Sequence, residues 1–147
     1  AAPVTGRLGG ADLRAGTVYR FGEYRLSLEE VLEFAAQWDP QDFHTDPAAA
    51  DAGAFGGIIA SGIQTMAVLQ RLTVLGVYRD WQVIAGRSMR EVQFLRPVRP
   101  GDVLTGWARI DEVIADDRGR ADVVIATELT VGDRPVLRAV TDVVVRY

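Results

Sequence analysis

The chain has 147 residues, of which 48% are hydrophobic and 24% are charged, as in an ordinary single globular domain. Its formal net charge of −4 disfavours general binding to nucleic acids or acidic membranes, because phosphate contacts need clustered Lys and Arg. Since there is no cysteine, the chain has no disulfide, no thiolate nucleophile and no Cys-ligated metal.

Residues 1–16 are rich in Gly and Ala and show no periodicity, so we interpret them as an N-terminal arm before a domain at residues 17–147. The first six residues lack the basic-then-apolar pattern of a signal peptide. No apolar run approaches the length of roughly 18 residues that predicts a transmembrane helix. A cytoplasmic protein without membrane segments is the expectation that fits these features.

The first half of the domain predicts a strand, a helix and an irregular segment. Residues 17–26 carry β-forming residues in rough alternation, which indicates a strand. Ser27 and the glutamate three residues later form a capping-box pattern, and apolar residues then recur at helical spacing to about residue 38. Residues 39–57 are rich in Asp, Pro, Gly and Ala, and Pro47 favours a short helix there.

The second half predicts one long helix and then strands. The helix runs from Ser61 to about Gly76, and its mostly apolar sequence indicates burial on most sides. Four strands are expected at residues 83–94, 103–113, 121–131 and 136–147. Because short turns join them, including residues 97–102, consecutive strands should pair antiparallel. The layout is that of an α+β domain whose sheet wraps around the long helix.

His44 is the only histidine of the sequence, and Asp39 precedes it by five residues, just past the first predicted helix. Histidine is the side chain that most readily exchanges a proton near neutral pH, and a nearby carboxylate can orient it. In a non-helical bend, both side chains can face one cavity. The alternative, which spacing alone leaves open, is a helix stop followed by a solvated histidine. One histidine supplies too few ligands for a zinc site.

Ser61 and Gly62 stand where the long helix should begin. Backbone N–H groups at a helix N-terminus are unpaired and lie at the positive end of the helix dipole. Since Gly62 has no side chain to block its N–H, that group could hold a carbonyl oxygen that gains negative charge. Alternatively, Ser61 is only an N-cap and Gly62 only permits close packing. Further along, Arg96 and Arg99 could contact phosphates or be solvated residues beside a turn.

Taken together and in this order, these segments resemble the MaoC-like hydratase/dehydratase family, whose known members have a hot-dog fold. Asp39 and His44 match the Asp and His of its (R)-specific enoyl-CoA hydratases. The residues 55–62 look like the approach to the family's central helix, and residues 94–102 look like its strand-and-turn signature. Gln41 stands where the hydratase pattern commonly has Asn. The implied architecture is a single hot-dog domain with an antiparallel sheet around a long central helix.

The resemblance implies a lyase of fatty acid metabolism that hydrates 2-enoyl thioesters or dehydrates 3-hydroxyacyl thioesters without a cofactor or metal. Asp39 and His44 would hold a water between them, one taking its proton and the other supplying a proton to the α-carbon. The Gly62 N–H would stabilise the enolate-like thioester oxygen. The substrate would be an acyl-CoA or an acyl carrier protein thioester. Its expected contacts are Gln41, Phe43, Ser61 and Arg96.

Members of the family usually work as dimers or as two fused hot-dog units, so the resemblance implies a homodimer of this chain. Two other functions stay open at this point. Hot-dog folds also host thioesterases, and a fold alone does not settle function. The chain could also be a non-catalytic subunit of a hetero-oligomeric dehydratase, although the presence of both Asp39 and His44 weighs against a degenerate subunit.

Overall fold

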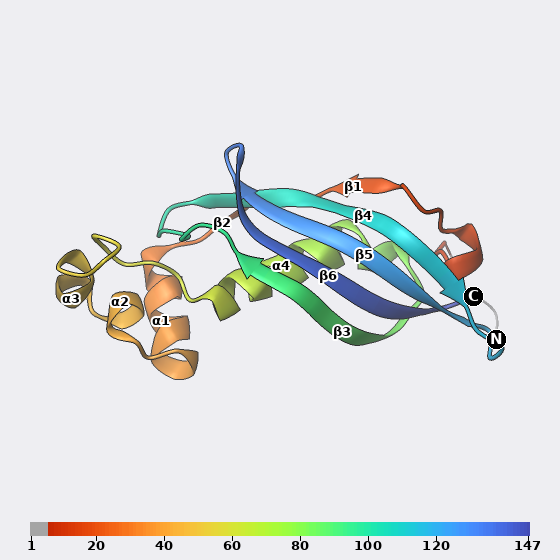
Figure 1. Cartoon of the computed structure of the whole chain (residues 1–147), viewed down its shortest axis with the longest axis horizontal. Helices are drawn as coiled ribbons and strands as arrows, with labels where there is room; N and C mark the ends of the chain where they lie inside the picture. Colours follow the sequence, from red (N-terminus) through yellow and green to blue (C-terminus); the bar gives the residue numbers. More distant parts are fainter. Residues whose placement is uncertain (1–5) are drawn as a thin grey trace.

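In a computed structural model of the chain, which describes residues 6–147, an antiparallel sheet curves around one long helix (Figure 1). Its strands are β1 (Val18–Arg20), β2 (Tyr24–Arg25), β3 (Val83–Phe94), β4 (Val103–Ala115), β5 (Arg120–Val131) and β6 (Arg134–Arg146). The strand order is β1-β4-β5-β6-β3, and β2 also pairs with β4. The helix is α4 (Gly62–Gly76). This arrangement confirms the predicted α+β fold; the first five residues of the predicted arm lie outside the described residues.

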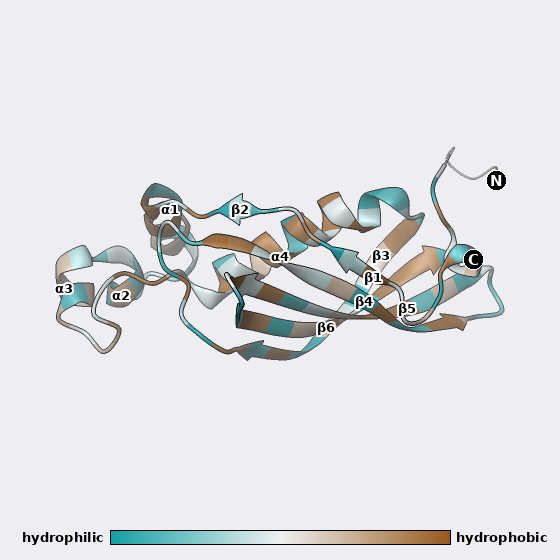
Figure 2. Cartoon of the chain, turned by 90° about the horizontal axis from the view of Figure 1, so that it is seen from above, coloured by the Kyte–Doolittle hydropathy of each residue, from teal (hydrophilic) through white to brown (hydrophobic). Residues whose placement is uncertain are grey.

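The core lies between α4 and the concave face of the sheet. Alternate residues of β4 point toward the helix, so Leu104, Ala108 and Ile110 are fully buried. From the helix, Leu69 and Leu72 face the sheet and are buried in turn. Figure 2 shows hydrophobic residues both along α4 and on the strands beside it. Burial of these apolar side chains is the main force that holds the sheet around the helix.

The helix α4 is less buried than its sequence indicates, because the sheet covers only one of its sides. Ile63, Val74 and Leu75 are exposed at 54%, 37% and 44%. Beside them runs β3, an edge strand whose side chains are exposed along almost its whole length. We call these three helix residues and the side chains of β3 the α4–β3 surface. It leaves apolar groups and a strand edge without a partner within the described chain.

The four strands expected in the second half are confirmed to within two residues at each end, but one expected pairing is wrong. The strand β3 pairs with β6 rather than with β4, which lies between β1 and β5. The connecting residues bond elsewhere: Val98 O accepts the Ala60 N–H at 2.8 Å, and Gly101 N–H donates to Leu26 O at 2.6 Å. The connection is therefore tied to the approach to α4 instead of closing a hairpin.

The single strand expected at residues 17–26 is two short strands, both paired with β4. Between them, Phe21 turns into the core and is 7% exposed. The carbonyls of Phe21 and Gly22 accept hydrogen bonds from Thr105 Oγ1, and the Phe21 N–H donates to Gly106 O at 2.9 Å, so the segment between the two strands stays attached to β4. Upstream, a short 3-10 helix, η1 (Gly10–Asp12), contacts β5, and another, η2 (Tyr78–Asp80), follows α4.

Three helices extend beyond one end of the sheet (Figure 1): α1 (Leu28–Trp38), α2 (Asp42–Thr45) and α3 (Pro47–Asp51). The helix α1 has the predicted capping box, since Ser27 and Glu30 exchange side chain–backbone hydrogen bonds. The short helix after residue 46 is also confirmed. The expected bend at His44 is wrong, because this residue lies within α2. No helix formed by residues 6–147 is long and apolar enough to cross a membrane.

Candidate active site

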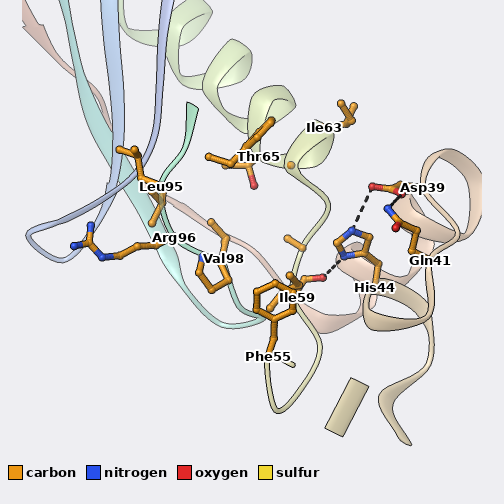
Figure 3. A pocket seen from close by; sticks show the side chains of 15 residues that line it. Asp39, Gln41, His44, Phe55, Ile59, Ile63, Thr65, Leu95, Arg96 and Val98 are labelled. Carbon is orange, nitrogen blue, oxygen red and sulfur yellow. Dashed lines mark hydrogen bonds and ion pairs between the residues drawn. The ribbon is translucent and has the colours of Figure 1, made fainter. Parts of the chain in front are cut away.

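A cavity of about 510 Å³ lies where the N-terminus of α4, the end of β3 and the corner between α1 and α2 meet (Figure 3). Its lining includes the apolar residues Phe55, Ile59, Ile63, Phe94, Leu95 and Val98. Its other lining residues include Asp39, Gln41, His44, Gly62, Thr65 and Arg96. The three sequence segments that suggested chemistry therefore meet at one place, although they are far apart in the chain.

The corner between α1 and α2 turns Asp39 and His44 toward each other. Asp39 is the C-cap of α1, and two short backbone bonds shape the turn: Gln41 N–H to Asp39 O at 2.8 Å, and His44 N–H to Gln41 O at 2.9 Å. His44 Nε2 then lies 3.3 Å from Asp39 Oδ2. The His44 side chain is 5% exposed and the Asp39 side chain 21%, so the imidazole is held from behind while the carboxylate stays accessible.

The protonation pattern of the His44 ring follows from its backbone contact. Nδ1 lies 2.7 Å from the carbonyl oxygen of Ile59, which can only accept a hydrogen bond, so Nδ1 carries a proton. In the neutral ring, the lone pair is therefore on Nε2, on the side of Asp39 (Figure 3). The Phe43 ring packs edge-on against the imidazole, with the two ring centroids 4.3 Å apart, and restricts its rotation. An imidazole held in this way can accept a proton at Nε2.

Both carboxylate oxygens of Asp39 accept strong hydrogen bonds. Gln41 Nε2 donates to Oδ1 at 2.7 Å, and Ser61 Oγ donates to Oδ2 at 2.7 Å. The bond from Gln41 has the largest effect on the Asp39 pKa, followed by that from Ser61, and with His44 they outweigh burial and hold the pKa below its ordinary value of 3.8. Asp39 is therefore ionised near neutral pH.

The first residue of α4 presents an unpaired donor to the cavity. The N-cap Ser61 accepts the Ile63 N–H at its Oγ, at 3.2 Å, whereas the Gly62 N–H has no partner among residues 6–147. A Cβ at position 62 would lie 2.6 Å from Phe94 Cε1, so any residue other than glycine requires that ring to move. At the positive end of the helix dipole, such an N–H can stabilise an oxygen that gains negative charge.

The chain matches the MaoC like domain over residues 12–132. It belongs to the MaoC-like family. It is 38% identical over 119 residues to the uncharacterized protein YdeM of Bacillus subtilis, covering 80% of this chain and 82% of that protein. It is 32% identical over 146 residues to 3-hydroxyacyl-thioester dehydratase Z of Mycobacterium tuberculosis, covering 93% and 94%. The MaoC-like dehydratase structure from Rhodospirillum rubrum superposes with a TM-score of 0.87 at 31% identity, covering 95% and 97%.

The remaining expected substrate contacts of this MaoC-like domain divide into two groups. Gln41 and Arg96 line the cavity, and Arg96 Nη1 donates to Pro135 O at 2.9 Å. Phe43 and Ser61 are not among the lining residues. The Phe43 ring packs against His44, and Ser61 donates a hydrogen bond to Asp39. Arg99 does not line the cavity either, and its Nη2 donates to Phe55 O at 2.6 Å.

Several residues of the MaoC-like site were not assigned a role from the sequence, and two of them contact the residues proposed for catalysis. The backbone carbonyl of Ile59 fixes the His44 ring, and the ring of Phe94 packs on the start of α4. A backbone contact between residues 15 positions apart leaves no mark on side-chain identity, so no sequence pattern identifies Ile59. Phe94 belongs to a segment that carries the family resemblance, which is a signal of its importance but not of its contact with Gly62.

Proposed function

We propose that this MaoC-like protein is a hydratase/dehydratase of 2-enoyl (3-hydroxyacyl) thioesters. The observation that carries the proposal is the placement of the Asp39–His44 pair and the unpaired Gly62 N–H around one largely apolar cavity. Addition of water to a conjugated thioester needs a base for the water and a donor for the oxygen that becomes negative. The name of the relative 3-hydroxyacyl-thioester dehydratase Z supports the same reaction class.

In the proposed reaction, His44 Nε2 takes a proton from a water molecule whose oxygen adds to the β-carbon. The electron pair of the double bond moves toward the thioester oxygen, which the Gly62 N–H stabilises. The imidazolium then returns a proton to the α-carbon. Hydrogen bonds from Gln41 and Ser61 hold the pKa of Asp39 below its ordinary value and so make it a weak base, and we assign it the role of orienting the water and stabilising the imidazolium. Dehydration is the reverse path.

The cavity volume of about 510 Å³ lies within the range of typical ligand sites. Its apolar wall suits an acyl group, and Gln41 is a polar group that we assign to the thioester end of the substrate. The guanidinium of Arg96, which also lines the cavity, suits the phosphates of CoA or of a carrier-protein pantetheine arm. We therefore propose an acyl-CoA or an acyl carrier protein thioester as the substrate.

We infer that a second copy of the chain covers the α4–β3 surface in a homodimer. An uncovered edge strand presents unpaired backbone groups, and the side chains of β3 are exposed with it. Two-fold symmetry allows the same edge to pair with itself. Ile63 belongs both to this surface and to the cavity lining, so a second copy would also help to close the site.

The rival thioesterase function has less support from the same residues. Ser61, the serine nearest the pair, is fully buried and does not line the cavity, and its Oγ donates to Asp39 rather than to His44. It is therefore not placed as a nucleophile activated by a histidine. A purely non-catalytic subunit would have no need of the aligned pair, so we propose that this chain is itself the catalyst.

The test uses the purified protein and a series of 2-enoyl-CoA substrates of increasing chain length, with the enoyl absorbance band and free CoA followed in parallel. The proposal predicts loss of the enoyl band without release of free CoA. Release of CoA with an unchanged enoyl band would identify a thioesterase. Absence of both changes for every chain length would contradict a catalytic role for this chain acting alone.

A further inference from the structure

We propose that Ser61 is a positioning residue, which holds the Asp39 carboxylate in place relative to both His44 and the Gly62 N–H. The inference rests on the proposed hydratase function and changes the role expected for this serine. Ser61 is 0% exposed and is absent from the cavity lining, so it does not contact a substrate. Its effect on the reaction must pass through the groups that it touches.

The hydroxyl group of Ser61 has one proton, and it is used for Asp39. Oγ lies 2.7 Å from Asp39 Oδ2, the same oxygen that faces His44 Nε2 at 3.3 Å. As an acceptor, Oγ takes the Ile63 N–H at 3.2 Å. A serine hydroxyl that donates to a carboxylate and accepts from a backbone amide has a fixed direction. It therefore fixes the direction of Oδ2 as well.

Ser61 also joins two parts of the site that come from distant segments. It is the N-cap of α4 and the residue directly before Gly62, whereas Asp39 ends α1 and is 22 positions away. The Ser61 carbonyl is held in turn by the N–H and the hydroxyl of Thr65, at 3.1 and 3.3 Å. One anchored residue thus sets the spacing between the carboxylate and the donor at the start of the helix.

The second oxygen of the carboxylate has a different support. Gln41 holds Oδ1 at 2.7 Å, but Gln41 is exposed and lies two residues after Asp39 in the same α1–α2 corner, so it moves with that corner. Only Ser61 ties Asp39 to α4 by a side-chain hydrogen bond among residues 6–147. Removal of its hydroxyl leaves Oδ2 free to rotate away from His44 while Gln41 keeps its own bond.

The experiment compares steady-state hydration of crotonyl-CoA by the wild type and by Ser61→Ala, Ser61→Cys and Ser61→Thr. Cysteine keeps the size of serine but is a weak donor, whereas threonine keeps the hydroxyl group. Loss of alignment of this kind should lower kcat roughly 10- to 100-fold in Ser61→Ala and Ser61→Cys. KM should stay within about twofold because Ser61 is outside the cavity, and Ser61→Thr should recover most of kcat.

The matched control is Ser27→Ala, which removes the equivalent N-cap of α1. Ser27 has no contact with the Asp39 carboxylate. This substitution should lower the melting temperature about as much as Ser61→Ala does and leave kcat unchanged. A folded Ser61→Ala with wild-type kcat, or a folded Ser61→Thr as slow as Ser61→Ala, would overturn the positioning role alone. A wild type inactive on all enoyl thioesters would instead overturn the proposed function on which this role rests.

Discussion

At the start of α4, the space beside Gly62 is as important as its N–H. A Cβ added to Gly62 would lie 2.6 Å from Cε1 of the Phe94 ring, and both residues line the cavity. Phe94 is 56% exposed, so its ring has room to move. A methyl group at position 62 would therefore move the ring within the site rather than disturb the core.

We expect Gly62→Ala to lower kcat/KM for crotonyl-CoA roughly 10- to 100-fold, because a displaced ring misplaces the thioester near the N–H donor. Stability should be kept, since alanine favours a helix more than glycine does. Steady-state kinetics and thermal unfolding check both statements. The double variant Gly62→Ala/Phe94→Ala is the control: it removes the clash and should be faster than Gly62→Ala. Equal rates for the two variants would contradict the steric explanation.

At the residue scale, the sequence alone predicts the identities that carry the proposed chemistry but not their connections. Asp39, His44 and Gly62 follow from spacing, from the helix start and from the family resemblance. The bond from Ser61 to Asp39 does not, because it joins the ends of two helices whose packing is a tertiary property. For the same reason, the hydrogen bond from His44 to the Ile59 carbonyl was found only in the structure.

At the element scale, β3 and the exposed side of α4 form the surface that we assign to a second copy. Met89 in the middle of β3 is 39% exposed, and it borders a smaller cavity between this strand and α4. We expect Met89→Asp to give a monomer in size-exclusion chromatography with light scattering, because a buried unpaired charge opposes association. Val18→Asp, on the opposite edge strand and 51% exposed in the wild type, should remain dimeric.

A dimeric Met89→Asp, or a monomeric wild type, would contradict this assignment of the surface.

The elements themselves were largely predictable, since capping residues and periodicity are local. The pairing of β3 with β6 was not predictable, because two consecutive strands can either pair as a hairpin or lie apart in the sheet. The nonlocal hydrogen bonds of Val98 and Gly101 decide between these arrangements. The short helix α2 was missed because one turn of helix has too few residues to show periodicity.

At the scale of the whole molecule, a polar network on the outer face of the sheet ties β3 to β6. The buried carboxylate of Asp142 accepts hydrogen bonds from Arg90 and Ser88, and the bond from Arg90 is the largest of the effects that lower the Asp142 pKa. The pKa of an aspartate in an unfolded chain is about 3.9. A carboxyl group whose pKa is lower in the folded protein stabilises the fold at pH values above that unfolded pKa. That contribution is lost as the pH falls through the folded pKa.

We therefore expect Asp142→Asn to lower the free energy of unfolding by about 1 kcal/mol at neutral pH. The difference from the wild type should shrink as the pH falls below about 4, where the unfolded carboxyl group becomes protonated. Urea unfolding over this pH range measures the difference. Asp111→Asn, which removes an exposed partner of Arg109, should change stability little at any pH. A pH-independent loss in Asp142→Asn would contradict the electrostatic explanation.

The proposed reaction requires Asp39 and His44 to act together on an enoyl thioester. The most direct test is the rate at which the wild type, Asp39→Ala and His44→Ala remove the enoyl absorbance of crotonyl-CoA, with circular dichroism to show that each variant is folded. We predict that the wild type is active and that each folded variant loses roughly 100- to 10,000-fold in kcat, as expected for loss of a proton-transfer group or its partner. Full activity in either folded variant would contradict the account.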